Sequence, residues 1–188
     1  MASTTTRDRI VAAAVEMTTS SGWAAVTMAR LAEEAGVSRQ TVYNEVGSKP
    51  ALAETMILEE LARFLRVVEE AFDAVPGDLT RAIERAVSDV LTYARANPLL
   101  HAVVSATHGA DTELLPLLTT NAGSLLGVAK EVISARVVPY APGIDPAHLD
   151  PAIDMVVRVV LSHVMQPSGS PEQTGADIAW LAGQVLGT

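Results

Sequence analysis

The chain has 188 residues, 49% of them apolar, a formal net charge of −9 and no cysteine. The missing cysteines exclude disulfides, thiol catalysis and thiolate metal sites, and the apolar runs are far shorter than the roughly 20 residues of a membrane span. The N-terminus lacks the apolar core of a signal peptide, so we expect a cytoplasmic protein that has no membrane partner.

The acidic charge is distributed unevenly. Residues 1–50 hold five basic and five acidic side chains, whereas residues 51–188 hold the other 8 basic and 17 acidic ones. An acidic surface repels nucleic acid. A DNA-binding surface is therefore expected only in the N-terminal part.

Apolar residues recur at helical spacing along the whole chain, and no alternating strand pattern of useful length appears, so the fold class is predicted to be all-α. Three short helices come first, over about residues 6–19, 28–35 and 39–45. Thr27 and Ser38 are good N-caps for the second and third of them. Gly36 turns the chain between these two helices, and Gly47 ends the third.

About six longer helices are predicted to follow, which makes about nine in all. Ser48 caps a fourth helix that runs to about Ala74, and Asp78 caps a fifth that ends near Asn97. Pro98 opens a short sixth helix. The last three are expected over residues 113–137, over residues 150–164, and from an S-x-x-Q capping box at residues 170–173 onward.

The three short helices have the order of a helix-turn-helix motif, in which the last helix enters the major groove. Its side chains carry guanidinium, amide and hydroxyl groups suited to base edges, while Val42 and Val46 are expected to anchor its other face. Tyr43 can reach a phosphate, and Lys49 lies at a helix N-terminus that suits a phosphate. The expected DNA-binding residues are Thr27, Ser38, Arg39, Gln40, Thr41, Tyr43, Asn44, Ser48 and Lys49. The alternative is a solvated surface helix.

The pattern RIVAAAVEM…GWAAVTMARLAEEAGVSRQTVYNEVGSKPALAETM, within residues 7–57, resembles the N-terminal domain of the TetR family of transcriptional repressors. The Thr27 cap, the Ala-Gly-Val-Ser turn, Tyr43 and the Gly-Ser-Lys segment carry the resemblance. The chain departs from the family at Asn44, where His or Arg is frequent, at Val46, where Phe is usual, and at Pro50, where an acidic residue is common. The first departure bears on the operator sequence.

This resemblance implies a helix-turn-helix domain over residues 1–47 and a ligand-binding and dimerisation domain over residues 48–188. A homodimer would read two half-sites of a palindromic operator, about 34–36 Å apart or at multiples of this. The apolar residues of the last two helices cover more surface than one core face requires. The expected interface residues are Ile153, Val156, Val160, Val164, Trp180, Leu181 and Val185. The alternative is that both faces are ordinary core.

The fourth to eighth helices are rich in Ala, Val and Leu, and a pocket lined by them would suit an elongated apolar molecule. Asn121 interrupts an apolar stripe that includes Leu125 and Val128, so its amide needs a partner from either the ligand or the protein. The expected ligand-binding residues are Phe64, Leu91, Tyr93, His101, Val104, Leu118, Asn121, Leu125 and Val157.

Two segments, TVYNEVGSK and RVVLSHVMQPSG, are similar to actinobacterial TetR-like regulators linked to fatty acid or alkane metabolism. This similarity implies a fatty acid or an acyl ester as the small hydrophobic effector.

Enzymatic and metal sites find little support in the sequence. No serine lies in a G-x-S-x-G setting, and the one tight His–carboxylate cluster, His108 with Asp111 and Glu113, lacks the spacing of a helical metal site. We predict no catalytic residue, cofactor or metal. The leading hypothesis is a repressor that an effector releases from duplex DNA; the alternatives are a DNA-binding protein without an effector and, less favoured, a small helical enzyme.

Overall fold

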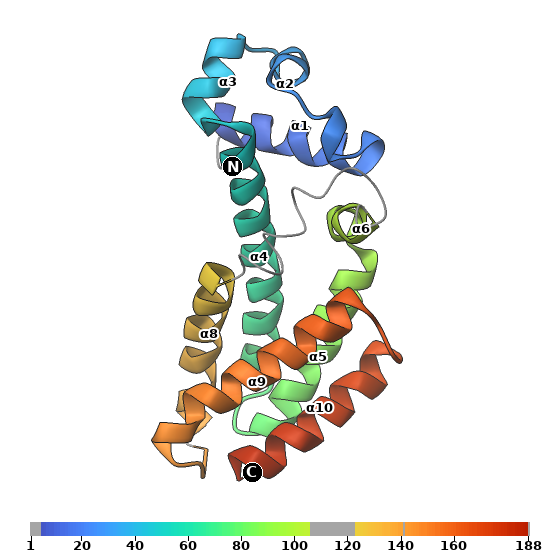
Figure 1. Cartoon of the computed structure of the whole chain (residues 1–188). Helices are drawn as coiled ribbons and strands as arrows, with labels where there is room; N and C mark the ends of the chain where they lie inside the picture. Colours follow the sequence, from blue (N-terminus) through green and yellow to red (C-terminus); the bar gives the residue numbers. More distant parts are fainter. Residues whose placement is uncertain (1–4, 106–122, 141, 188) are drawn as a thin grey trace. The chain divides into compact units, whose positions relative to one another are not determined.

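A computed structural model describes residues 5–105, 123–140 and 142–187 (Figure 1). These residues form nine α-helices, two short 3-10 helices and no strand, which confirms the all-α prediction. No helix among them is long and apolar enough to cross a membrane. The elements are α1 (Thr6–Ser21), η1 (Trp23–Ala25), α2 (Met28–Glu34), α3 (Arg39–Val46), α4 (Lys49–Ala74), α5 (Leu79–Ala96), α6 (Pro98–Ser105), α8 (Gly123–Val137), η3 (Val138–Tyr140), α9 (Pro146–Met165) and α10 (Pro171–Leu186).

The side chains predicted to cap the helices do so. Each accepts a hydrogen bond, 2.9–3.3 Å long, from the backbone N–H three residues further on, and such a bond satisfies one of the free donors of a helix N-terminus. The capping residues are Thr27, Ser38, Ser48, Asp78 and Ser170. The predicted capping box at Ser170 is only half formed, because the Gln173 side chain donates to Asp177 instead (2.9 Å).

The start of α9 differs from the prediction. The helix begins at Pro146 rather than near Asp150, because Asp145 caps it by accepting a hydrogen bond from the Ala147 N–H (2.8 Å). Pro151 therefore lies inside the helix, where it has no N–H to donate to the preceding turn. Both prolines follow an aspartate, so the local sequence fits either start.

Residues 106–122 lie outside the described residues. They include Leu118 and Asn121 of the predicted ligand site and the cluster of His108, Asp111 and Glu113. The helix predicted over residues 113–137 is described from Gly123 onward, as α8.

The chain packs as two compact units. Unit 1 comprises residues 1–60 and 97–122, and unit 2 comprises residues 61–96 and 123–188, so that α4 contributes to both. The boundary expected between residues 47 and 48 separates a DNA-binding domain from a ligand-binding and dimerisation domain, and it remains a prediction. The packing division differs from it because Leu99 and Val103 of α6 belong to the same apolar core as α1, α2 and α3.

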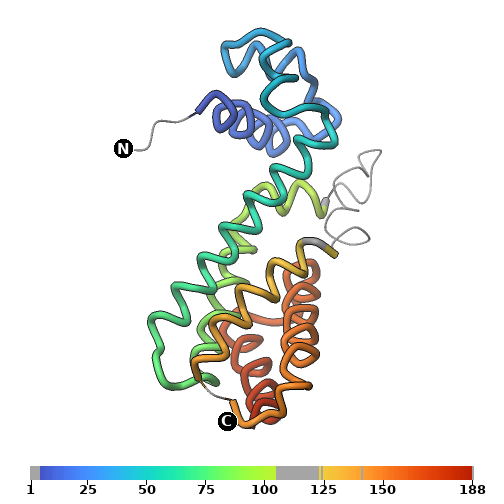
Figure 2. Tube along the Cα trace, turned by 90° about the vertical axis from the view of Figure 1, so that its left-hand side faces the viewer, coloured from blue at the N-terminus to red at the C-terminus, as the bar shows by residue number. Residues whose placement is uncertain are grey.

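In unit 2, α5 and α10 approach each other closely, and Figure 2 shows α9 beside α10. At Gly175 the two helices are so close that an added Cβ would lie 2.2 Å from Ser88 Oγ and 2.9 Å from the Glu84 carbonyl oxygen. The Ser88 hydroxyl donates to the Pro171 carbonyl (3.2 Å). Only glycine fits at this crossing, so the two backbones meet without an intervening side chain.

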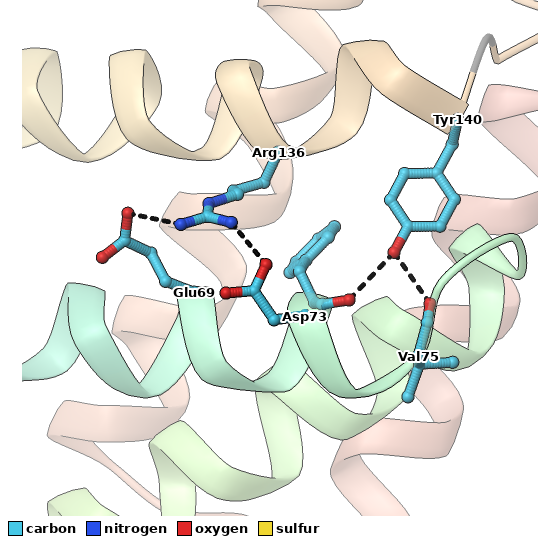
Figure 3. Close-up of polar contacts among 6 residues, drawn as sticks. Glu69, Asp73, Val75, Arg136 and Tyr140 are labelled. Atoms are coloured by element: carbon cyan, nitrogen blue, oxygen red, sulfur yellow. Dashed lines mark hydrogen bonds and ion pairs between the residues drawn. The ribbon is translucent and has the colours of Figure 1, made fainter.

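Polar contacts hold the end of α4 to α8 and η3 within unit 2 (Figure 3). Arg136 donates to Glu69 (2.9 Å) and to Asp73 (2.6 Å), and the bond to Glu69 raises the pKa of the guanidinium. The Tyr140 hydroxyl donates to the carbonyls of Phe72 (3.1 Å) and Val75 (2.8 Å). Burial raises the pKa of Tyr140, so the phenol stays protonated and remains a donor near neutral pH.

Candidate nucleic-acid interface

Helix α3 has one buried and one exposed face. Val42 and Val46 are 0% and 4% exposed and pack into the core of unit 1, as predicted from their spacing. Arg39, Gln40 and Asn44 are exposed. The two valines therefore fix the rotation of the helix about its axis and direct its amide and guanidinium groups outward.

The turn before α3 depends on Gly36. Its φ of 65° lies in the left-handed region, which glycine adopts without the strain of a Cβ. Directly after it, the Val37 N–H donates to the Ala32 carbonyl (2.9 Å). This turn sets where Ser38 begins the next helix.

Two pairs of side chains on α3 are hydrogen-bonded to each other. Gln40 Nε2 donates to Asn44 Oδ1 at 3.0 Å, one helical turn away. The hydroxyls of Ser38 and Thr41 lie 2.9 Å apart. The Arg39 side chain makes no hydrogen bond or ion pair with the part of the chain that the structure describes. Of the predicted base-reading side chains, Gln40, Thr41 and Asn44 are thus pre-oriented by a hydrogen bond, and Arg39 is not.

Lys49 has an intramolecular partner at the start of α4. Its Nζ donates to the Trp23 carbonyl (3.0 Å) and lies 4.8 Å from the centre of the indole ring, within the range of a cation–π contact. Trp23 itself is buried, 2% exposed. Lys49 therefore ties the η1 turn to α4, a role that the sequence pattern did not indicate; its predicted phosphate contact remains a prediction.

Two other basic side chains also bind the backbone near α3. Arg7 donates to the Glu45 carbonyl (3.4 Å) and to Thr55 Oγ1 (3.3 Å), which joins α1 to the ends of α3 and α4. Arg30 donates to the Ala25 carbonyl (2.9 Å). Neither role was predicted from the sequence, because the partners are two backbone carbonyls and a hydroxyl 48 residues away, which leave no local pattern.

The described residues predicted to line a ligand site belong to both units. In unit 2, the rings of Phe64 and Tyr93 meet edge to face with 4.8 Å between their centres. Three further residues of unit 2 are buried or half-buried: Leu91, Leu125 and Val157. His101 and Val104 belong to unit 1, the first exposed and the second half-buried.

The apolar stripe expected along α8 faces inward only in part. Val128 is 42% exposed, whereas Ala129 is buried in a cluster against which Leu126 packs. Val132 of the expected stripe does pack against this cluster, so the prediction of an inward-facing residue is wrong at Val128, where Ala129 takes that place.

The residues predicted for the dimer interface differ in exposure. Trp180, Leu181 and Val185 of α10 are 66%, 49% and 51% exposed. Ile153 is 5% exposed and lies in a cluster with Leu65, Ala129 and Val157, so its side chain is part of the core, and its predicted place in the interface remains a prediction. The half-buried residues Val156, Val160 and Val164 pack against the core of their own unit.

Sequence analysis missed two exposed apolar residues of α9. Met155 and Val159 are 67% and 37% exposed. Their separation of four residues places them on one face of the helix, on the side away from the buried Ile153 and Val157. This i, i+4 spacing is the signal that could have identified them.

Two family models match the chain. Residues 10–56 match the model described as bacterial regulatory proteins, tetR family, and residues 78–184 match that of the bacterial tetracyclin repressor, C-terminal domain. The chain is also 30% identical, over 93% of its length and 82% of the other protein, to the HTH-type transcriptional regulator AlkX of Mycobacterium tuberculosis.

Solved structures show the same fold. The TetR family repressor AlkX from Dietzia sp. strain DQ12-45-1b, implicated in biodegradation of n-alkanes, superposes with a TM-score of 0.75 at 27% identity and covers 95% of this chain and 98% of its own. The TetR-family transcriptional repressor QsdR of R. erythropolis has a TM-score of 0.63 at 20% identity, over 97% of this chain and 95% of its own, and shows a likeness of fold alone.

Proposed function

The chain belongs to the TetR family of bacterial regulatory proteins and is a DNA-binding transcriptional regulator, not an enzyme; from that premise, we propose that it binds a palindromic operator as a homodimer in the cytoplasm. We further propose that a small hydrophobic effector, such as a fatty acid or an acyl ester, releases this repressor from the operator.

The observation that carries the proposal is the two-faced helix α3. Its valines are buried, so the rotation of the helix is fixed and its amide and guanidinium side chains face outward. Such groups match the donors and acceptors of base edges in the major groove. The equal numbers of acidic and basic residues in segment 1–50 avoid the repulsion that the acidic remainder of the chain would impose.

The homodimer is supported by the apolar residues that α9 and α10 leave exposed. We call this set the α9–α10 apolar surface; it consists of Met155, Val159, Leu161, Trp180, Leu181 and Val185. Large exposed apolar side chains favour association, because contact with a partner removes them from water. A second copy would also supply the second DNA-reading helix that a palindrome requires.

The effector proposal rests on two observations of different kinds. The relative from Dietzia is implicated in biodegradation of n-alkanes, and the described ligand candidates in unit 2 are apolar or aromatic: Phe64, Leu91, Tyr93, Leu125 and Val157. An effector that weakens DNA binding a hundredfold needs about 2.7 kcal/mol of differential free energy between the two states. At about 0.8 kcal/mol for each buried methylene, a few methylenes held in one state alone would suffice.

The first experiment tests DNA binding. The full chain is incubated with a randomised duplex pool, and bound fragments are selected and sequenced at several salt concentrations. Enrichment of a palindromic motif supports the proposal, and affinity should fall as salt rises. Binding without any enriched sequence would instead support a non-specific DNA-binding protein.

The second experiment tests the effector. Fatty acids, their methyl esters and n-alkanes of about eight to eighteen carbons are added to the free protein and to its operator complex. A matching chain should raise the melting temperature and release the DNA. Leu125→Trp, which enlarges a half-buried side chain, should abolish the response and leave DNA binding without effector intact. If no chain in the three series alters melting or release, the effector is not an acyl chain or an alkane.

A further inference from the structure

The hydrogen bond between Gln40 and Asn44 has a consequence for base recognition. Both side chains are exposed on α3 and lie four residues apart, a spacing that places them on one face of the helix. Gln40 Nε2 donates to Asn44 Oδ1 at 3.0 Å. The two amides are therefore joined before any DNA is present.

The bond determines which polar groups remain for a base. An amide side chain carries one acceptor oxygen and an NH₂ with two donors. The bond uses one N–H of Gln40 and one lone pair of the Asn44 oxygen, so each amide group keeps one further site beside the bond. The two groups that take no part in the bond are the Gln40 carbonyl oxygen, an acceptor, and the Asn44 NH₂, a donor, and these are the groups that the pair offers to a base.

Adenine matches this arrangement in the major groove. Its N6 amino group donates and its N7 accepts, whereas guanine offers two acceptors, cytosine offers a donor, and thymine offers an acceptor beside its methyl group. Guanine would leave the Gln40 oxygen without a donor, and cytosine would leave the Asn44 N–H groups without an acceptor. Adenine satisfies both halves of the pair.

Resting on the proposed operator binding, we propose that Gln40 and Asn44 act as one reading unit that selects an adenine, with Gln40 as the acceptor and Asn44 as the donor. Each amide holds the other in its reading orientation. Removal of either side chain leaves its partner free to rotate, so one substitution removes the contribution of both.

Arg39 supplies the matched control. It is an exposed neighbour on the same helix that makes no hydrogen bond or ion pair with the described residues. Its contribution to base reading should therefore be independent of the pair. Effects of independent groups on affinity multiply, whereas effects of coupled groups do not.

The test is a pair of double-mutant cycles on the duplex selected by the wild type. Affinities are measured for Gln40→Ala, Asn44→Ala and the double variant, and in parallel for Arg39→Ala alone and with Asn44→Ala. Each single substitution in the pair should weaken specific binding by roughly 5- to 150-fold, the loss expected for a bidentate base contact. The affinity of the double variant should be within a few-fold of that of the weaker-binding single variant. In the Arg39→Ala and Asn44→Ala combination, by contrast, the two losses of affinity should multiply.

Asn44→Asp tests the assigned polarity. The aspartate still accepts the hydrogen bond from Gln40, but it offers an acceptor to the base in place of a donor. A repeat selection with this variant should replace adenine by cytosine, whose amino group donates to acidic side chains. Melting curves of all variants check that these exposed positions leave the fold unchanged.

Three outcomes separate the possibilities. The inference is overturned, while operator binding stands, if the losses of affinity from Gln40→Ala and Asn44→Ala multiply in the double variant as they do with Arg39→Ala. It is also overturned if the preference for adenine in the selected motif is unchanged in Gln40→Ala and Asn44→Ala. A wild type that enriches no sequence would overturn operator binding itself, and the reading unit with it. Coupled losses together with the cytosine shift would establish the unit.

Discussion

Helix α3 and helix α10 both have a buried face, but the faces that they leave exposed have opposite chemistry. Helix α3 buries two valines and exposes amides, hydroxyls and a guanidinium group, whereas α10 buries a mixed apolar face that includes Ile178 and Leu186 and still exposes Trp180, Leu181 and Val185. A helix that exposes large apolar side chains is suited to a protein partner, and one that exposes hydrogen-bond donors and acceptors is suited to a nucleic acid. The contrast assigns the two partners to two different units of the same chain.

The supports beneath these surfaces differ as well. Around α3, side chains of Arg7, Arg30 and Lys49 donate to backbone carbonyls. Beneath α10, the backbone of Gly175 lies directly against α5. We call the hydrogen bonds around α3 the hydrogen-bonded support and the backbone contact beneath α10 the close-packed support. Substitutions in the two should lower the free energy of unfolding by different amounts.

The largest effect is expected from a charge on the α9–α10 apolar surface. Leu181→Glu should convert the proposed homodimer to a monomer, because burial of an unpaired carboxylate costs several kcal/mol. Analytical ultracentrifugation over a concentration series measures the change. Val128→Glu is the matched control, since Val128 is an exposed apolar residue of α8 outside that surface; a dimer lost in the control but kept in Leu181→Glu would contradict the assignment.

The next effect concerns the close-packed support. Gly175→Ala should lower the free energy of unfolding by about 1–3 kcal/mol, because the new methyl group overlaps Ser88 and the Glu84 carbonyl. Gly127→Ala, at a helical glycine of α8 with no atom within 4 Å of the added Cβ, should instead raise it by about 0.5–1 kcal/mol. Denaturant titration compares the two, and equal effects would show that the α5–α10 approach imposes no constraint.

A smaller effect is expected at the hydrogen-bonded support. Lys49→Met keeps most of the side-chain length but loses the bond to the Trp23 carbonyl and the contact with the indole ring, so stability should fall by about 1–2 kcal/mol. If the ammonium also contacts a phosphate, the variant should weaken all duplexes by one factor and reduce the salt slope by about 1. An unchanged slope with reduced stability would restrict Lys49 to the intramolecular role.

The smallest effect is expected where α4 ends. Tyr140→Phe keeps the ring beside Phe72 but removes the hydroxyl that donates to the carbonyls of Phe72 and Val75. The free energy of unfolding should fall by about 0.5–1 kcal/mol, and thermal unfolding at fixed pH detects such a loss. A loss as large as that of Gly175→Ala would mean that the polar contacts of unit 2 support it as strongly as its packing.

Local signals in the sequence predicted much of the fold because they act over three or four residues. The caps Thr27, Ser38 and Asp78 begin their helices as expected, and Val42 is buried as its spacing indicates. Long-range contacts were not predictable in this way. The partner of Lys49 is a backbone carbonyl 26 residues away, and Ile153 is an apolar residue that fits an interface as well as a core until its neighbours are known.

The same limit applies to the candidate site. The residue types on α3 indicated a base-reading helix, but the bond between Gln40 and Asn44 depends on side-chain rotamers, which residue spacing does not determine. The two candidate starts of α9 show another limit, because two identical Asp-Pro pairs carry the same local signal, and the helix begins at the first of them, where Asp145 is the cap.

The discontinuity of unit 1 has a consequence for the order of folding. Its core is complete only when Leu99 and Val103 join residues near the N-terminus, so the ribosome must release α4, α5 and α6 before that core can close. A fragment that ends at residue 60 would leave apolar surface of α1 without its α6 neighbours and should be prone to aggregation. Production of the DNA-reading helices as a free-standing fragment therefore requires either residues 97–105 in trans or a polar replacement of the surface that they cover.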